Sequence, residues 1–244
     1  MSFTYPPQWR KRWPAAWVLG RLFLTMLLFA TVDAFAHGVS DKDKLYIQSV
    51  SGVHVLPYMY LGAKHMVTGY DHLLFLVGVI FFLFRLKDVV SYVTLFAVGH
   101  SITLLVGVLF NIRANPFIID AIIGLSVVYK AFDNLGGFEK LLGFEPNPKA
   151  AVLIFGLFHG FGLATKIQEL AFSREGLLGN LISFNVGVEI GQFLALSMIL
   201  IAMTFWRQTK SFGRSAVFAN GALMCAGFIL IGYQLSGLLQ GKSL

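Results

Sequence analysis

The chain has 244 residues, of which 57% are hydrophobic and only 13% are charged. Soluble domains average about 45–50% apolar and about 25% charged residues, so this composition excludes a soluble enzyme and a disordered chain and predicts a polytopic helical membrane protein. The formal net charge is +7, but Lys and Arg are scattered singly between apolar runs. That pattern is typical of anchoring at a membrane surface and argues against a nucleic-acid interface. The single cysteine, Cys225, excludes an intramolecular disulfide and a Cys-based metal cluster.

Residues 1–36 have the pattern of a secretory signal peptide, with a basic stretch, an apolar run and a closing Ala-x-Ala sequence. Residues 15–36 are also long enough to form an uncleaved first helix. Both interpretations place the mixed, polar segment that follows outside the cytoplasm. We therefore expect an external segment at 37–64, with an interfacial helix near 58–61, and a membrane domain at 65–244.

Six apolar runs follow, and at 1.5 Å per residue they match a hydrocarbon core of about 30 Å, the shortest with help from flanking residues. The predicted fold class is therefore all-α, a bundle of about six transmembrane helices. Eight Lys and Arg residues fall in the predicted inner loops and seven in the outer segments, which agrees with an outside start and an outside finish. The runs cover residues 70–84, 89–110, 117–131, 150–164, 181–205 and 216–239.

Few ionisable residues fall in or beside these spans, and the predicted topology places all of them in the outer half of the membrane. A charged group at membrane depth costs about 2.5–3.5 kcal/mol on insertion scales, so each is a functional hypothesis by default. We expect no ionisable residue in the inner half of the spans. The candidates are His65, Asp71, His72, His100, Asp120, His159 and Glu189.

Two local patterns point to metal ligands. His65 and His72 are seven residues apart and share a face if the helix continues through Gly69. With Asp71 they offer two imidazoles and a carboxylate, which are suitable ligands for transition metals. The alternative is that Asp71 caps the span and His65 lies at the membrane interface. In the second pattern, His159 is followed by glycines that permit close helix approach, and the alternative is an imidazole satisfied by a backbone carbonyl.

A third pattern places Asn185, Glu189 and Gln192 at i, i+4 and i+7, as a polar stripe on one face of an apolar helix. Glycines on an adjacent face of this helix favour close packing against a neighbour. The signals at His100 and Asp120 are weaker, because each is also consistent with a single interhelical hydrogen bond.

The segments 65–74, 158–164 and 184–192 resemble the signatures of the HupE/UreJ family of bacterial membrane proteins. The resemblance covers about residues 62–240, which is essentially the whole predicted membrane domain. It implies a signal peptide, about six spans in a bacterial inner membrane, and a role as a secondary permease for nickel or cobalt.

The resemblance also implies site residues. His65, Asp71 and His72 correspond to the family's H-x5-D-H metal motif, and His159 corresponds to its second histidine motif. Met66 stands where the best-described branch has a proline, and the second motif here lacks that branch's further histidine and glutamate. The chain is therefore similar to the second branch of the family.

We expect a permease for a divalent transition metal (Ni, Co, Zn, Cu or Fe). The expected ligands are His65, Asp71, His72, His100, His159 and Glu189, supported by Asp120, Asn185 and Gln192. One alternative is a membrane-embedded metal-dependent hydrolase for a lipid or amphiphile, with Glu189 as general base. Another is a non-catalytic subunit of a membrane complex. The expected partners are the lipid bilayer, the metal ion and a homo-oligomer or membrane complex, without nucleic acid.

Overall fold

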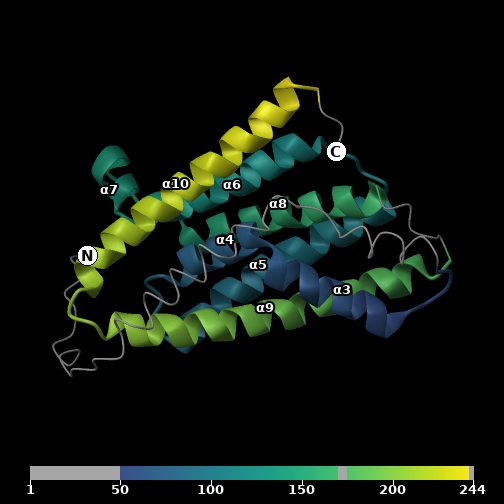
Figure 1. Ribbon diagram of the computed structural model, residues 1–244, viewed down its shortest axis with the longest axis horizontal. Coiled ribbons are helices and arrows are strands. Elements are labelled where there is room, and N and C mark those ends of the chain that lie inside the picture. Colours follow the sequence, from purple (N-terminus) through teal and green to yellow (C-terminus); the bar gives the residue numbers. More distant parts are fainter. Residues whose placement is uncertain (1–49, 170–174, 242–244) are drawn as a thin grey trace.

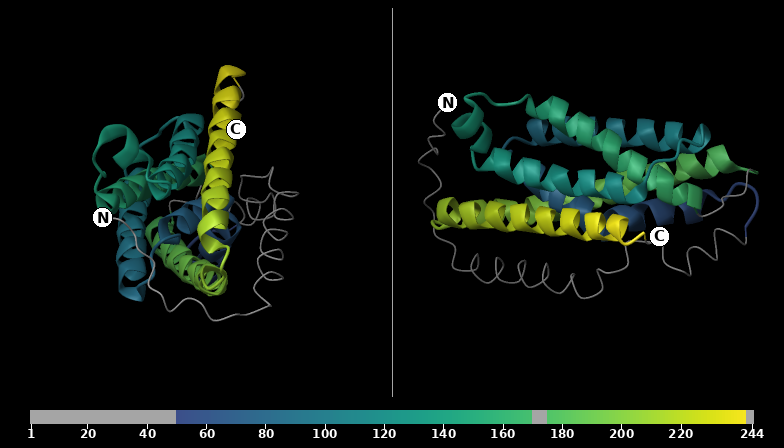
Figure 2. Two further views of the ribbon diagram at one scale, coloured as in Figure 1. Left: turned by 90° about the vertical axis from the view of Figure 1, so that its left-hand side faces the viewer. Right: turned by 90° about the horizontal axis from the view of Figure 1, so that it is seen from above.

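The computed structural model describes residues 50–169 and 175–241, and every regular element in these two ranges is a helix. The helices run roughly along the long axis of the molecule, with α10 inclined to the others (Figures 1 and 2). The predicted all-α bundle is confirmed, while the signal peptide predicted at 1–36 lies outside the described residues. The helices are α3 Val55–Thr68, α4 Tyr70–Ile80, α5 Leu86–Leu109, α6 Pro116–Asn134, α7 Gly137–Leu142, α8 Pro148–Glu169, α9 Leu177–Arg207 and α10 Phe212–Leu239.

Four of the described helices, α5, α8, α9 and α10, are long and apolar enough to cross a membrane. They match four of the six predicted spans. The other two predicted spans correspond to α4, an apolar helix of 11 residues, and to α6, which has 19 residues and carries Asp120, Lys130 and Asp133. The chain is a multi-pass helical membrane protein.

The first predicted span is the second half of a broken helix. α3 ends at Thr68 and α4 begins at Tyr70, and Gly69 between them has an extended conformation (φ −73°, ψ 96°). α3 is longer than the interfacial helix expected near 58–61, and it packs along α9. Residues 55–64, which the sequence assigned to an external segment, therefore belong to the bundle.

Glycines allow α3 and α9 to lie in close, parallel contact. A Cβ atom at Gly62 would lie 2.0 Å from the carbonyl oxygen of Phe184, and one at Gly187 would lie 1.9 Å from that of Met59. Only glycine fits at such distances, as is common where membrane helices pack. The glycines predicted to support close packing of α9 do so against α3.

Two further pairs of helices depend on glycines in the same way. In the parallel pair of α5 and α8, a Cβ atom at Gly160 would lie 2.1 Å from the carbonyl oxygen of His100. In the antiparallel pair of α6 and α10, Gly124 and Gly227 lie against each other. The close helix approach predicted beside His159 is confirmed, and it brings α5 and α8 together at the level of two candidate histidines.

One end of the bundle, here called the Arg207 end, is where α4, α6 and α9 end and α5, α8 and α10 begin. The buried Arg207 side chain donates hydrogen bonds to the carbonyl oxygens of Ile80, Phe81 and Leu83. A helix terminus leaves such carbonyls without intrahelical partners, so Arg207 holds the end of α4 against α9. The opposite end, where α6 begins, is called the Pro116 end.

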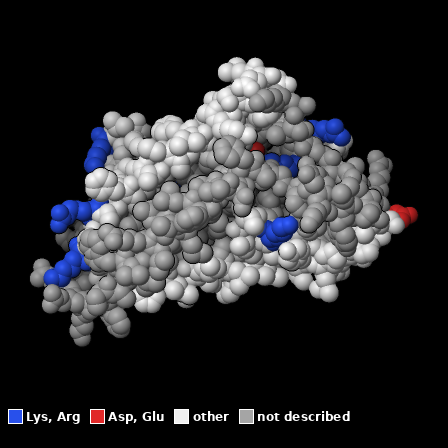
Figure 3. All heavy atoms as spheres, viewed as in Figure 1, with Lys and Arg blue, Asp and Glu red and all other residues white. Residues whose placement is uncertain are grey.

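Exposed basic side chains gather at the Arg207 end, on the left of Figure 3. At the Pro116 end, Arg113 is the exposed basic residue within the described ranges. Lys130 and Arg207, which the sequence placed in loops, are buried in helices. The exposed basic residues of the Arg207 end are Arg85, Lys87, Lys140, Lys149, Lys210 and Arg214.

Candidate metal centre

Four histidines from four helices converge inside the bundle: His65 of α3, His72 of α4, His100 of α5 and His159 of α8. The His72 ring is central, with its centroid 4.9 Å from that of His159, 5.2 Å from that of His65 and 5.9 Å from that of His100. Each of these ring pairs meets edge to face. We call these four side chains, together with Asp71, the imidazole cluster. The sequence motifs that supply them are far apart along the chain but adjacent in the fold.

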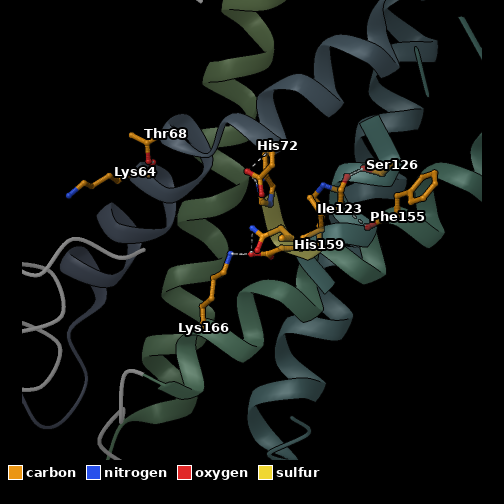
Figure 4. A network of polar contacts seen from close by, with 11 residues as sticks. Lys64, Thr68, His72, Ile123, Ser126, Phe155, His159 and Lys166 are labelled. Carbon is orange, nitrogen blue, oxygen red and sulfur yellow. Dashed lines mark hydrogen bonds and ion pairs between the residues drawn. The ribbon is translucent and has the colours of Figure 1, made fainter. Parts of the chain in front are cut away.

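Hydrogen bonds orient two of the four rings. His72 Nδ1 lies 3.0 Å from Asp71 Oδ1, and His159 Nδ1 lies 2.8 Å from the carbonyl oxygen of Phe155 (Figure 4). A carboxylate and a carbonyl only accept, so Nδ1 is the donor in both rings, and in the neutral form of such a ring Nε2 carries the lone pair. Histidines that bind metals have this arrangement, in which the second ring nitrogen donates to a carboxylate or carbonyl.

Three ring nitrogens of the cluster are left unsatisfied. The Nε2 atoms of His72, His100 and His159 are buried without a hydrogen-bond partner in the described part of the chain. These residues are only 3%, 1% and 0% exposed. An unsatisfied buried polar atom costs about 1–3 kcal/mol, and native structures contain few of them. Imidazole nitrogens that carry a free lone pair are suitable ligands for a transition-metal ion.

Within residues 50–169 and 175–241, no three His, Cys, Asp or Glu side chains are already arranged to hold a metal ion. The rings of the imidazole cluster instead pack against one another at the centroid separations given above. A bond from an imidazole nitrogen to zinc is about 2.0–2.1 Å long, so several rings must point their Nε2 atoms at one centre to bind an ion. Metal binding at this place therefore requires rotation of the rings.

The break at Gly69 changes how His65 and His72 meet. The sequence predicted a shared helix face if the helix continued through Gly69, but the helix ends there. The two rings are nevertheless 5.2 Å apart, because α4 follows α3 after one extended residue. The ligands of the first motif therefore come from two helical segments.

A layer of phenyl rings separates the imidazole cluster from the Arg207 end. Phe75, Phe96 and Phe155 each lie one helical turn from a histidine of the cluster, always toward that end. The Phe75 ring centroid lies 5.2 Å from that of Phe96 and 5.9 Å from that of Phe155. The sequence prediction did not single out these residues, although their spacing of three or four positions from each histidine is a signal that identifies them. We call them the phenyl layer.

The imidazole cluster lies near the middle of its helices. His100 is residue 15 of the 24 in α5, and His159 is residue 12 of the 22 in α8. His72 comes 17 residues after the start of α3 and 8 residues before the end of α4. Asp71 and His72 stand in the first turn of α4, where the predicted span at 70–84 begins, but α3 precedes them within the bundle.

Asp120 is bound by groups outside the imidazole cluster. Its buried carboxylate lies 2.9 and 3.1 Å from Lys166 Nζ and accepts a hydrogen bond of 3.3 Å from Gln234 Nε2. A small hollow between α4, α6 and α10 is lined by Asp71, Asp120 and Gln234 and by two apolar residues. Asp120 therefore shares a hollow with a residue of the cluster, while its charge is balanced by Lys166.

The predicted polar stripe of α9 has two different environments. Asn185 and Ser101 of α5 exchange hydrogen bonds of 2.8 and 3.2 Å, and Gln192 Nε2 donates to the carbonyl of Val93 at 3.3 Å. Glu189, in contrast, is exposed. It lies about 200° around the helix from Gly187, which packs on α3, so it points out of the bundle. The expectation that Glu189 is a buried group facing the histidines is wrong.

A second buried polar group lies at the Arg207 end. Lys130 is paired with Asp133, and Asn134 Nδ2 donates to the Gly78 carbonyl at 2.9 Å and to Asn220 Oδ1 at 2.8 Å. The expectation of no ionisable residue in this half of the spans is wrong, because the buried cations had been assigned to loops. We define the Arg207-end cluster as Arg207, Lys130, Asp133, Asn134 and Asn220.

Comparison with known proteins gives one match. A family model described as HupE / UreJ protein matches residues 41–240. The match includes every described helix and thus the whole imidazole cluster. No curated protein and no solved structure matches the chain.

Proposed function

The chain belongs to the HupE/UreJ family, and from this premise we propose that it is a secondary permease for a divalent transition metal of the nickel or cobalt kind. Membership of the family implies a metal-transporter role in the membrane. The proposal adds the residues that bind the metal, which are His65, Asp71, His72, His100 and His159.

The observation that carries this proposal is the set of three buried, unsatisfied Nε2 atoms beside the break of a discontinuous helix. In secondary transporters, ions bind near the bilayer midplane where spanning helices are interrupted. Here the break at Gly69 separates His65 from Asp71 and His72. A movement of α4 relative to α3 would therefore change the set of ligands around the ion, which is what a transport cycle requires.

The ligand chemistry supports a transition metal. Imidazole suits nickel, cobalt, zinc, copper and iron, whereas magnesium and calcium prefer sites made of oxygen ligands. Four imidazoles and one carboxylate converge in the cluster. Within the transition metals, the family favours nickel or cobalt.

The two sides of the cluster differ in access. On one side, a small hollow between α4, α6 and α10 is lined by Asp71, a residue of the cluster, and by Asp120. The phenyl layer and the contacts of Arg207 with the end of α4 separate the cluster from the Arg207 end. In the proposed cycle the ion arrives from the side of the hollow, and it leaves when α4 moves away from these contacts.

We assign the Arg207 end to the cytoplasm. The exposed basic residues gathered there support this orientation, because cytoplasmic loops carry an excess of Lys and Arg. The bundle would then lie in a bacterial inner membrane with residue 37 outside, and the proposed direction of transport is inward.

Hydrolysis is less well supported. A metal-dependent hydrolase needs a general base within hydrogen-bond reach of the metal-bound water. Glu189, which the sequence suggested for this role, is exposed, and Asp120 is bound to Lys166. Asp71 orients His72. We therefore propose transport alone.

The test is uptake of radioactive nickel into liposomes that contain the purified full-length protein. His72→Ala and His159→Ala should each lower uptake by about tenfold or more, because loss of metal ligands or of their orienting groups has effects of this size. His54→Ala is the matched control, because His54 bonds to the Ser51 carbonyl before α3 and lies outside the cluster. It should leave uptake unchanged.

Two results would contradict the proposal. One is wild-type uptake no greater than that of empty liposomes. The other is uptake that falls equally in His54→Ala and in the cluster variants, since this would mean that the cluster has no special role. Elemental analysis of the same preparations measures metal binding separately from flux.

A further inference from the structure

The ion pair between the half-buried Lys166 and the buried Asp120 has no part in the function proposed so far. Lys166 lies seven residues, or two helical turns, after His159, so the two side chains share a face of α8. Its ammonium group lies within 3.1 Å of both oxygens of Asp120 in α6. Figure 4 shows the Lys166 side chain and the dashed line from its ammonium group to a carboxylate oxygen.

The requirements of folding do not explain a lysine at this position. Moving an ammonium group and a carboxylate out of water costs several kcal/mol per ion, and their mutual attraction often does no more than offset this cost. Well-packed apolar side chains of similar volume would hold α6 against α8 equally well. α8 is otherwise apolar enough to cross a membrane. The pair therefore calls for a functional explanation.

The position of the pair supplies that explanation. Asp120 and Asp71 line the same hollow, so a divalent ion beside Asp71 experiences the field of both carboxylates. We propose that Lys166 is a tethered counter-cation of the metal site, whose ammonium group neutralises Asp120 and so limits how tightly the site holds a divalent ion. This inference rests on the proposed function, since it concerns the affinity and exchange of the transported metal.

The effect of the pair on metal affinity follows from charge balance. Asp120 and Lys166 together contribute no net charge beside the imidazole cluster. Removal of the ammonium group leaves a second carboxylate to attract the ion, and removal of the carboxylate leaves an ammonium group that repels it. Charges interact more strongly in a protein interior than in water, so both effects reach the cluster. The intact pair keeps the bound ion exchangeable, as a permease requires.

The test is titration calorimetry of nickel chloride with the full-length protein in detergent, for four members of a charge cycle. Lys166→Met should lower the Kd by about tenfold or more, Asp120→Asn should raise it by about tenfold, and the double variant should lie within about threefold of the wild type. If the pair only stabilised the fold, both single variants would bind nickel more weakly than the wild type. The double variant would then bind nickel no more tightly than the single variants.

Two further variants complete the design. Lys166→Gln is uncharged but retains a donor for Asp120, so it should also bind nickel more tightly, and it provides a second neutral variant if Lys166→Met does not fold. Lys130→Met is the matched control, because it removes the lysine of the other buried pair, at the Arg207 end, and should leave the Kd unchanged.

The transport assay adds an independent readout. Lys166→Met should bind nickel more tightly and yet transport it more slowly at saturation, because release is delayed. The inference is overturned if Lys166→Met and Lys166→Gln bind nickel no more tightly than the wild type, or if Lys130→Met shifts the Kd as much. Failure of the proposed function would be a different result, in which the wild type itself binds no nickel.

Discussion

The bundle contains two buried polar clusters that differ in how their polar atoms are satisfied. In the Arg207-end cluster, the terminal nitrogens of Arg207 donate to three backbone carbonyls, and only its Nε lacks a partner among the described residues of this cluster. Lys130 is paired with Asp133, and Asn134 bonds to Asn220. In the imidazole cluster, three ring nitrogens have no partner among the described residues. Both lie among apolar helices, so their surroundings do not account for the difference.

This difference indicates which polar groups stabilise the fold and which are available to bind a ligand. A buried polar group bonded within the protein contributes to stability, whereas one without a partner costs stability until something binds it. Removing groups from the Arg207-end cluster should therefore damage folding. Removing imidazoles should damage metal binding and leave folding intact.

The largest effect is expected at the Arg207 end. Arg207→Met leaves the carbonyls of Phe81 and Leu83 without their side-chain donor, while the Ile80 carbonyl keeps only the backbone N–H of Leu83, so the free energy of unfolding should fall by about 3 kcal/mol. Thermal unfolding in detergent, followed by circular dichroism, measures this loss. The fraction that remains folded should still bind nickel with its Kd unchanged. A stability equal to that of the wild type would mean that the Arg207-end cluster does not stabilise the fold.

A smaller loss is expected where glycine brings the cluster together. Gly160→Ala places a Cβ atom 2.1 Å from the His100 carbonyl, so α5 and α8 must separate, at a cost of about 2 kcal/mol. The same shift moves His100 away from His159 and should weaken nickel binding. Gly221→Ala in α10 is the control, because a Cβ atom there meets nothing within 4 Å. It should raise stability by about 0.5–1 kcal/mol without changing nickel binding.

His100→Phe is the most specific test of the imidazole cluster. The phenyl ring keeps the stacking on Phe96 and removes an unsatisfied nitrogen, so stability should stay constant or rise by about 1 kcal/mol. Nickel affinity should nevertheless fall by about tenfold, since one ligand is lost. A large loss of stability would mean that His100 holds the fold as Arg207 does, and the two clusters would no longer differ.

The smallest effect is expected at Glu189. Glu189→Gln should not lower the free energy of unfolding, because the side chain is exposed and the substitution removes a charge from a spanning helix. Nickel Kd and uptake should also equal those of the wild type. A tenfold loss of nickel affinity would show that Glu189 is a metal ligand after all.

Much of the imidazole cluster could be predicted from the sequence. The histidines stand out because ionisable groups are rare in apolar runs, and the glycines beside His159 indicated close helix packing. What could not be predicted is the broken first helix. Residues 55–64 are too mixed in composition to suggest a segment of the bundle, and only the packing of Gly62 on α9 places them there. The sequence therefore did not predict the helical segment that precedes His72 in the bundle.

Other features depend on tertiary contacts that no local pattern contains. Lys130, Lys166 and Arg207 lie at the ends of apolar runs, where a basic residue usually marks a loop. Only the fold shows that Arg207 bonds to the end of α4, that Lys166 pairs with Asp120 of α6, and that Lys130 is buried beside Asp133 of its own helix. The direction of Glu189 likewise follows from the packing of Gly187 on α3, which the i, i+4, i+7 spacing does not reveal.

The central claim is that the imidazole cluster binds the metal, and X-ray absorption of the nickel-loaded full-length protein tests it most directly. The account predicts a nitrogen-rich coordination shell with the multiple-scattering pattern of imidazole, and loss of that pattern in His159→Ala. A shell of oxygen ligands alone, or a spectrum identical in the wild type and in His159→Ala, would contradict it.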